Sequence, residues 1–250
     1  MTDPIPTTDA PVLLSTRRIS RHFGGLVAVS DLSFDVHEGE ILGLIGPNGA
    51  GKSTTFNILS GFLRLTSGEI TFMGRSLEGG APWKAARRGL VRTFQHASLL
   101  SDMTVYDNIY VGTYQGIKAR AERVARVHET ASVLGLGHLL DELACNLPHG
   151  RQRMLSLAIA FASRPKLLCL DEPLTGLNQT EAAEAVAVIR RLRDDFGVSI
   201  LFVEHNMQAV MSICDRIVVL HHGKQLASGT PEEIRQNPAV IDAYLGGAAA

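Results

Sequence analysis

Short apolar runs alternate along the chain with stretches in which apolar residues recur at helical spacing. Several runs are continuous and bounded by turn residues, which is typical of strands buried on both faces of a mostly parallel sheet. The expected strands cover residues 12–20, 32–37, 41–45, 69–73, 90–93, 167–170, 199–203, 216–220 and 224–228.

Helical spacing predicts helices that begin at Gly51, near Val105, near Lys118, after Gly150, near Gln179 and near Asn206. Residues 98–162 have almost no strand signal, and strands resume after them. We therefore expect an α/β domain over residues 12–245. Its core is formed by residues 12–97 and 163–245, with a helical subdomain at about 98–162. Residues 1–11 and 246–250 are expected to be a flexible tail and a flexible end.

The composition excludes few classes of protein. The chain has 24 Lys and Arg against 25 Asp and Glu, so it has no basic excess for a nucleic-acid partner. Its three cysteines form no CxxC pair, which argues against a disulfide framework or a zinc site and fits a reducing cytoplasm. The apolar runs are far shorter than the roughly 20 residues that cross a bilayer, and residues 1–12 lack a signal-peptide pattern. Work at a membrane would therefore depend on another subunit.

Residues 46–53 match the phosphate-loop pattern GxxxxGK[ST], with an apolar run before them and helical spacing after them. Glycines let the backbone close around phosphate oxygens, and the positive end of the following helix faces the same anions. Lys52 is expected to reach the β- and γ-phosphates, and Ser53 to ligate Mg²⁺. The alternative is a glycine-rich turn with an incidental Lys-Ser pair. The expected nucleotide-binding residues are Gly46, Pro47, Asn48, Gly49, Ala50, Gly51, Lys52, Ser53 and Thr54.

A second candidate element is the apolar run 167–170, which ends in Asp171 and Glu172. The carboxyl end of a buried strand lies at the crevice where α/β sheets bind ligands. Asp171 is expected to hold Mg²⁺, and Glu172 to orient or deprotonate the attacking water. Alone, two solvated acids at a strand end would explain this run. Beside a phosphate loop, the catalytic interpretation is favoured.

Because it has both the phosphate loop and the acidic pair, the chain resembles the ATPase subunits of ATP-binding cassette (ABC) transporters over residues 13–245. The resemblance implies a P-loop NTPase core with a mostly parallel sheet, an N-terminal antiparallel β subdomain and an inserted α-helical subdomain. It also implies ATP hydrolysis coupled to transmembrane transport, with ATP and Mg²⁺ as cofactors.

The resemblance gives catalytic roles to two further residues. Gln95, in Thr93-Phe94-Gln95, is expected to contact the metal or the lytic water, and His205, after the run 200–203, to contact the γ-phosphate. The implied catalytic residues are Glu172, His205, Gln95 and Lys52, and the implied metal ligands are Ser53, Gln95 and Asp171. The adjacent His221 and His222 are interpreted as part of a turn.

Two further stretches resemble the family. Phe23 has the spacing of the ring that stacks on adenine, with Ala28 close by at the nucleotide, although a core phenylalanine at a strand end is a serious alternative. The family's D-loop corresponds to Thr175, Gly176, Leu177 and Asn178, with Asn178 where aspartate is more usual.

The signature loop, which acts on the nucleotide of the opposite subunit, departs from the family's Leu-Ser-Gly-Gly-Gln. The corresponding residues are Leu147, Pro148, His149, Gly150, Arg151 and Gln152. Two interpretations compete. The backbone N–H groups at the start of the following helix still bind phosphate, or the loop is weakened and hydrolysis is slow. Related importers tolerate such residues, which favours a working loop.

Residues 23–29, 91–95 and 229–246 resemble the branch that imports branched-chain amino acids, although an ATPase for lipopolysaccharide transport also ends in Tyr-Leu-Gly. This resemblance implies a membrane permease, a second ATPase subunit that is identical or paralogous, and a periplasmic or extracellular substrate-binding protein. It places the chain at the cytoplasmic face of the inner membrane, with residues 95–106 gripping the permease.

Three alternatives stay open. One is a member of the same superfamily that serves DNA repair or the ribosome, although no long coiled coil or second cassette is seen. Another is a catalytically weak module that dimerises on ATP, which Pro148 and Asn178 keep open. The third is a small-molecule kinase, for which no lid or acceptor site is evident. The sequence does not identify the transported cargo.

Overall fold

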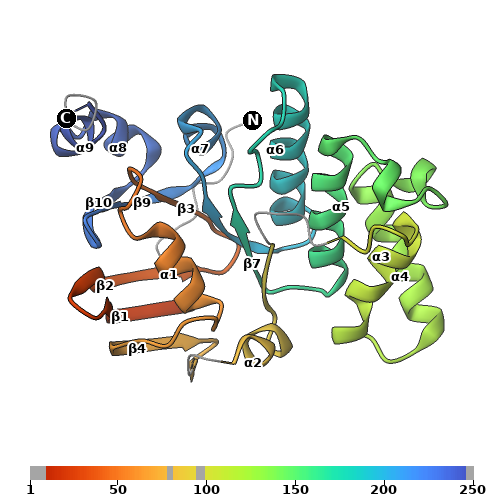
Figure 1. Ribbon diagram of the computed structural model, residues 1–250, viewed down its shortest axis with the longest axis horizontal. Helices are drawn as coiled ribbons and strands as arrows, with labels where there is room; N and C mark the ends of the chain where they lie inside the picture. Colours follow the sequence, from red (N-terminus) through yellow and green to blue (C-terminus); the bar gives the residue numbers. More distant parts are fainter. Residues whose placement is uncertain (1–9, 78–80, 94–98, 246–250) are drawn as a thin grey trace.

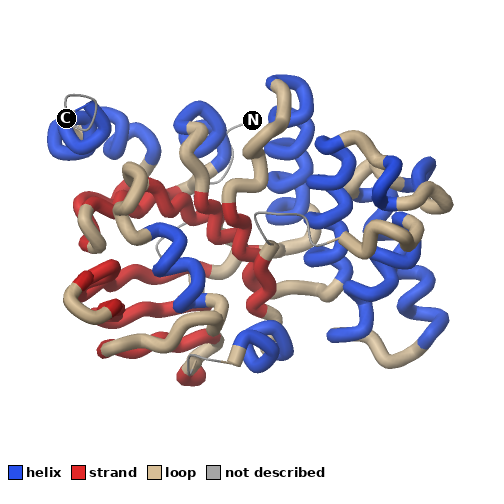
Figure 2. Tube along the Cα trace, viewed as in Figure 1, coloured by secondary structure: helices blue, strands red, loops and turns tan. Residues whose placement is uncertain are grey.

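The computed structural model describes residues 10–77, 81–93 and 99–245. Within these residues the strands form two sheets, and helix α1 lies between the two sheets (Figures 1 and 2). Helices α6 to α9 lie on the other side of the larger sheet, and helices α3 to α5 gather at one end of the molecule (Figure 1). This arrangement is the predicted α/β fold.

The larger sheet has the strand order β10-β9-β3-β8-β7-β6, in which only β10 pairs antiparallel to its neighbour. Strands β3 and β8 are buried along their whole length, as their continuous apolar sequences predict. The strands are β3 (Ile41–Ile45), β6 (Leu90–Arg92), β7 (Leu167–Asp171), β8 (Ser199–Val203), β9 (Arg216–His221) and β10 (Lys224–Gly229).

The smaller sheet is antiparallel, with the order β2-β1-β4-β5. It contains β1 (Val12–Phe23), β2 (Leu26–His37), β4 (Ser67–Phe72) and β5 (Arg75–Ser76). Strands β1 and β2 extend beyond the predicted residues and meet at the turn Gly24–Gly25. The outer end of this hairpin is exposed at Phe23, Leu26 and Val27, so it lacks the buried apolar pattern that marks a strand in the sequence.

The predicted helices begin at or near the expected positions: α1 (Lys52–Leu59), α3 (Val105–Gly112), α4 (Arg120–Val133), α5 (His149–Ala162), α6 (Gln179–Asp194) and α7 (Met207–Ile213). Helices α2 (Pro82–Arg87), α8 (Pro231–Gln236) and α9 (Pro238–Leu245) were not predicted; each begins with a proline, which marks a turn as readily as the first position of a helix. Within the described ranges, no helix is long and apolar enough to span a bilayer.

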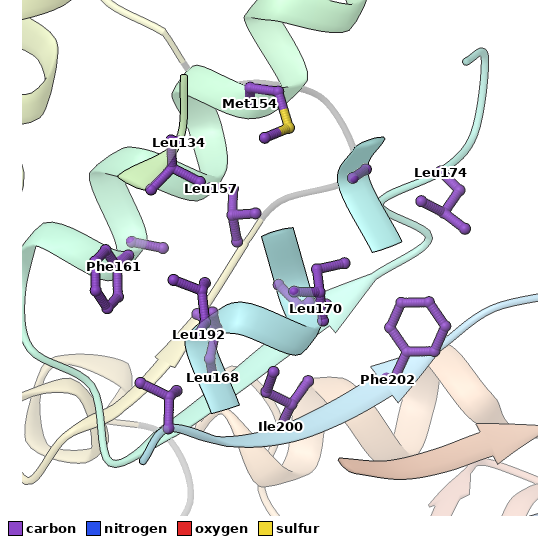
Figure 3. Close-up of a cluster of buried hydrophobic side chains, with 14 of the residues drawn as sticks. Leu134, Met154, Leu157, Phe161, Leu168, Leu170, Leu174, Leu192, Ile200 and Phe202 are labelled. Carbon is purple, nitrogen blue, oxygen red and sulfur yellow. The ribbon is translucent and has the colours of Figure 1, made fainter. Parts of the chain in front are cut away.

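Helices α3 to α5 follow β6 in the chain and lead into β7, its neighbour in the sheet. Their apolar side chains join those of β7, β8 and α6 in one continuous core. Figure 3 shows Leu157 and Phe161 of α5 beside Leu168 of β7 and Leu192 of α6. The opposite face of the larger sheet packs with α1 and the smaller sheet in a second core. The strand ends that carry the candidate site are therefore held from both faces.

Candidate nucleotide-binding site

The phosphate loop joins the end of β3 to the start of α1, and its glycines are required by close backbone packing. Gly46, with φ 152°, leaves space for Leu220 O, which would lie 2.2 Å from an added Cβ. Gly51, with φ 101°, would place a Cβ 2.6 Å from Ala28 O. The backbones of β9 and β2 thus pack directly against the loop, and any side chain larger than that of glycine is excluded at Gly46 and Gly51.

Lys52 is the first residue of α1, and its side chain is buried inside the loop. Its Nζ donates to Gly46 O at 2.6 Å and to Pro47 O at 3.2 Å. Burial lowers the pKa of the Lys52 ammonium, while the Glu172 and Asp171 carboxylates oppose the decrease. The lysine therefore lies in the field of the predicted acidic pair. The adjacent Ser53 is exposed at the start of α1.

Asp171 is the last residue of β7, which lies between β6 and β8 in the sheet, and Glu172 follows it directly. Burial raises the pKa of the Asp171 carboxyl, and Arg92, whose Nη2 lies 3.7 Å from Asp171 Oδ2, opposes the increase. Glu172 has a left-handed backbone with φ 47°, which is strained for a residue with a side chain. Its N–H donates to Val203 O at 2.8 Å. Such strain is often found at functional sites.

His205 follows β8 and comes close to the acidic pair. Its Nδ1 lies 3.9 Å from Glu172 Oε1, and most of its side chain is exposed. Lys52, Glu172 and His205 come from the ends of β3, β7 and β8, which are neighbours in the sheet. The structure therefore brings together three of the four expected catalytic residues at the carboxyl ends of parallel strands. Gln95, the fourth, lies outside the described residues.

Phe23 and Ala28 lie on the smaller sheet. Phe23 is 42% exposed at the end of β1, so its ring is not part of either core. The guanidinium of Arg21 lies 4.6 Å from the ring centroid. Ala28 packs through its carbonyl against the phosphate loop, as described above for Gly51. An exposed ring on the strand pair that supports the loop is suited to stack on a base.

The signature loop begins α5, with Leu147 buried and Pro148 as the residue before the first turn. Gln152 Nε2 donates to Leu147 O at 3.0 Å, which closes the loop on itself. Within its own chain the loop is remote from the phosphate loop, because α5 and α1 lie on opposite sides of β7 (Figure 1). The structure does not bring residues 147–152 to the cluster of Lys52, Glu172 and His205.

The D-loop connects β7 to α6 and ends at Asn178, which caps that helix. Asn178 Oδ1 accepts from Glu181 N at 3.0 Å, and Glu181 Oε2 accepts from Asn178 N at 3.0 Å. This reciprocal capping box satisfies two N–H groups at the start of α6. Asparagine therefore performs the capping that an aspartate would provide here.

The signature loop and the D-loop pack on each other within one chain. An added Cβ on Gly150 would lie 2.4 Å from Glu181 Oε1, and one on Gly176 would lie 2.9 Å from His149 Cε1. Arg151 and Glu184 form an ion pair at 3.7 Å beside this contact. The two loops are 23 or more residues apart in sequence, so no local pattern predicts that they meet.

We expect Gly150→Ala to disturb both loops, because its Cβ displaces the Glu181 carboxylate that completes the capping box. The free energy of unfolding should fall by about 1 kcal/mol, the usual contribution of a helix cap. Urea denaturation measures this change. Gly137→Ala is the matched control, since no described atom lies within 4 Å of the Cβ it adds. Equal stability of the two variants would contradict the packing argument.

No site role was predicted from the sequence for Arg92 or Tyr244. Arg92 donates to Asn57 Oδ1 at 2.7 Å and to Ser60 Oγ at 3.0 Å, and thereby ties β6 to α1 beside Asp171. The available signal in the sequence was the charge of Arg92 inside a predicted buried strand. Burial raises the pKa of Tyr244 to about 12, and a hydrogen bond with the Gly46 backbone opposes the increase. No sequence signal places the last helix beside the phosphate loop.

Helix α9 and the phosphate loop border a cleft of ≈ 630 Å³. Its walls include Pro47 to Ala50, Asp242, and the rings of His221 and His222, whose centroids are 4.1 Å apart. His221 is the last residue of β9 and pairs with Lys224 of β10, whereas His222 lies in the turn between the two strands. The interpretation of both histidines as part of a turn therefore holds for His222 only.

Comparison with known proteins agrees with this geometry. A family model described as ABC transporter matches residues 29–175, and one described as branched-chain amino acid ATP-binding cassette transporter matches residues 224–250. The high-affinity branched-chain amino acid transport ATP-binding protein LivG of Salmonella typhimurium is 44% identical over 94% of this chain and 98% of its own. The corresponding BraF of Pseudomonas aeruginosa is 40% identical over the same shares.

A solved ATP-binding cassette of an ABC transporter in its ADP conformation has a TM-score of 0.85 and 27% sequence identity, covering 95% of this chain and all of its own. A nucleotide-free cassette has a TM-score of 0.84 and 28% identity, covering 94% of this chain and 99% of its own. Because a family model matches more than half of the residues and relatives above 40% identity span nearly the whole length, the chain belongs to the ABC transporter family of ATP-binding, ATP-hydrolysing proteins.

Proposed function

We propose that this chain is the ATP-binding and hydrolysing subunit of an importer that moves branched-chain or other hydrophobic amino acids through a membrane permease. The main support for ATP hydrolysis is that Lys52, Glu172 and His205 lie close together at the ends of adjacent strands. The cargo is proposed from the names of the relatives and from the match over residues 224–250.

The residues at the site fit a bound ATP with Mg²⁺. Glycine backbone, a buried ammonium and the start of α1 form a cradle for phosphate oxygens, while an exposed hydroxyl on Ser53 and the Asp171 carboxylate are hard oxygen ligands. Phe23 and Ala28 would hold the adenine, and Ser53, Gln95 and Asp171 the metal. A bound Mg²⁺ neutralises charge that develops on the phosphates.

Glu172 would take the proton of the attacking water, because its carboxylate stands at the strand end beside Lys52. His205, within 3.9 Å of Glu172, would orient the carboxylate and contact the γ-phosphate. Lys52 would bind the β- and γ-phosphates in place of its present bonds to Gly46 and Pro47 carbonyls. These steps use residues that the fold already holds together.

The signature loop would act on the nucleotide of a second ATPase subunit, because within its own chain it is separated from the phosphate loop (Figure 1). The first N–H groups of α5 would meet the γ-phosphate there. The contact between Gly150 and Glu181 would transmit closure of the dimer to the D-loop. ATP bound between two chains favours the closed state, and hydrolysis reopens it.

The proposed transporter also contains a permease and a substrate-binding protein. In this proposal, residues 95–106 would dock on a permease. Leu100 and Met103 are each 44% exposed in that segment and offer apolar contact area. We also propose a core of residues 12–97 and 163–245 with a helical subdomain at about 98–162. A substrate-binding protein outside the membrane would deliver the cargo, and this chain would lie on the cytoplasmic face.

Reconstitution tests the proposal. The chain, a partner ATPase, permease subunits of a branched-chain amino acid importer and a substrate-binding protein would be combined in proteoliposomes, and ATP-dependent uptake of labelled leucine measured. We expect uptake that stops when EDTA removes Mg²⁺. Export of a lipopolysaccharide, or uptake of another cargo only, would contradict the amino acid assignment. Nucleotide binding without turnover in the assembled complex would instead indicate a dimerisation module.

A further inference from the structure

Glu204 is a buried carboxylate with no role in the proposed chemistry. It follows β8 directly, precedes His205, and is only 1% exposed. A carboxylate removed from water needs hydrogen-bond donors to offset the loss of hydration. The donors identify what Glu204 does in this fold.

Among the described residues, three backbone N–H groups donate to this carboxylate. Leu174 N donates to Oε1 at 2.8 Å, from a position 30 residues earlier in the chain. His205 N and Asn206 N donate to Oε2 at 3.1 and 3.3 Å. The two oxygens therefore bond to two different segments, and the side chain joins them.

The first segment carries the proposed catalytic base. Leu174 lies two residues after Glu172 and immediately before the D-loop. The left-handed backbone of Glu172 persists only where neighbouring bonds determine it. Glu172 N bonds to Val203 O, and Leu174 N bonds to Glu204 one residue further on, so both ends of this turn are anchored to the end of β8.

The second segment carries His205, the residue proposed to contact the γ-phosphate. The bonds to His205 N and Asn206 N fix the backbone from which the imidazole projects, and Asn206 caps α7. Glu204 Oε2 also lies 3.8 Å from His205 Nδ1, on the same ring nitrogen that faces Glu172. A carboxylate near Nδ1 favours the tautomer with a proton there.

We infer that Glu204 is a positioning residue that holds the base Glu172, the start of the D-loop and His205 in one rigid unit. The inference rests on the proposed roles of Glu172 and His205. It follows from donor and acceptor chemistry, because only an acceptor with two oxygens satisfies N–H groups on both sides. A glutamine of the same shape keeps one acceptor and turns an NH₂ group toward the other donors.

Glu204→Gln and Glu204→Asp in the full chain test this inference. Glu204→Gln should lower kcat for ATP by at least about 10-fold, since misplacement by about 1 Å costs roughly 100-fold. The KM for ATP should stay unchanged, because the phosphate loop is untouched. Glu204→Asp should recover part of kcat, because the shorter acid still reaches the adjacent His205 and Asn206 N–H groups while losing Leu174.

Glu40→Gln is the matched control. Glu40 is also buried, and it accepts from His37 N and Arg216 Nε at the opposite end of β3 from the phosphate loop. Both glutamine variants should unfold at lower temperature, but only Glu204→Gln should lose kcat. Unchanged kcat in folded Glu204→Gln, or an equal loss in Glu40→Gln, would overturn the inference.

Glu172→Gln, assayed in parallel, separates this inference from the proposed function. If Glu172→Gln abolishes turnover while Glu204→Gln retains it, only the role of Glu204 is wrong. If Glu172→Gln retains wild-type turnover, the assignment of the base fails and the positioning role falls with it. We expect loss in both, with Glu172→Gln the more severe.

Discussion

Replacement of Glu172 by glutamine is expected to lower the turnover of ATP by about 10²–10⁴-fold, the usual contribution of a general base. The amide has the same shape but does not accept the proton of water. ATP binding should be retained, because the phosphate loop and Lys52 are unchanged. Turnover is measured by phosphate release, and binding by titration with a fluorescent ATP analogue.

Glu232→Gln is the control for this substitution. Glu232 is exposed on α8, so its replacement removes the same charge at a position away from the site. It should leave turnover and binding unchanged. A folded Glu172→Gln chain with undiminished turnover would exclude Glu172 as the base. Loss of ATP binding together with turnover would show instead that the left-handed turn at this position had collapsed.

The features that the sequence predicts are those that a short segment determines. The buried strands 41–45 and 199–203 appear with the predicted bounds, because their apolar runs are continuous and end in turn residues. The phosphate loop was predicted for the same reason, since eight consecutive residues carry its geometry. The apolar run 167–170 located Glu172 at a strand end, and the family resemblance then located His205 after another strand.

Contacts between distant segments could not be predicted. Glu204 bonds to Leu174 across 30 residues, and Arg92 bonds to Asn57 across 35 residues. Glu204 and Arg92 are ordinary charged residues at the end of a strand or within one, so the surrounding sequence does not identify their hydrogen-bond partners. The neighbouring positions of β7 and β8 in the sheet bring Leu174 to Glu204, and the packing of α1 on the sheet brings Asn57 to Arg92.

The departures at the signature loop and D-loop also needed the structure. In the sequence, Asn178 and Pro148 weaken the resemblance to an active ATPase. In the fold, Asn178 completes a capping box, and Pro148 supplies the extended residue before α5 without needing a side-chain cap. Proline is favoured near the first turn of a helix, where its missing N–H has no intrahelical partner. Neither residue disrupts the backbone that the proposed function requires.

Replacement of Lys52 by alanine is expected to lower turnover by about 10²–10³-fold, the typical effect of removing one preorganised donor. Unlike Glu172→Gln, it should also weaken ATP binding, because the ammonium contacts phosphate oxygens before and during the reaction. Lys52 is suited to this role by its burial, which strengthens its electrostatic interactions, and by carbonyl partners that it can exchange for phosphate.

Lys84→Ala is the matched control, because Lys84 is exposed on α2 and lies over the Trp83 ring away from the site. Its turnover and ATP affinity should equal those of the unaltered chain. The contrast between Lys52→Ala and Glu172→Gln separates the two contributions. A lysine that binds phosphate in the ground state, and more strongly in the transition state, affects KM and kcat together, whereas a base that acts only on water affects kcat alone. Lys52→Ala with unchanged affinity would show that the phosphates bind through backbone N–H groups without the ammonium.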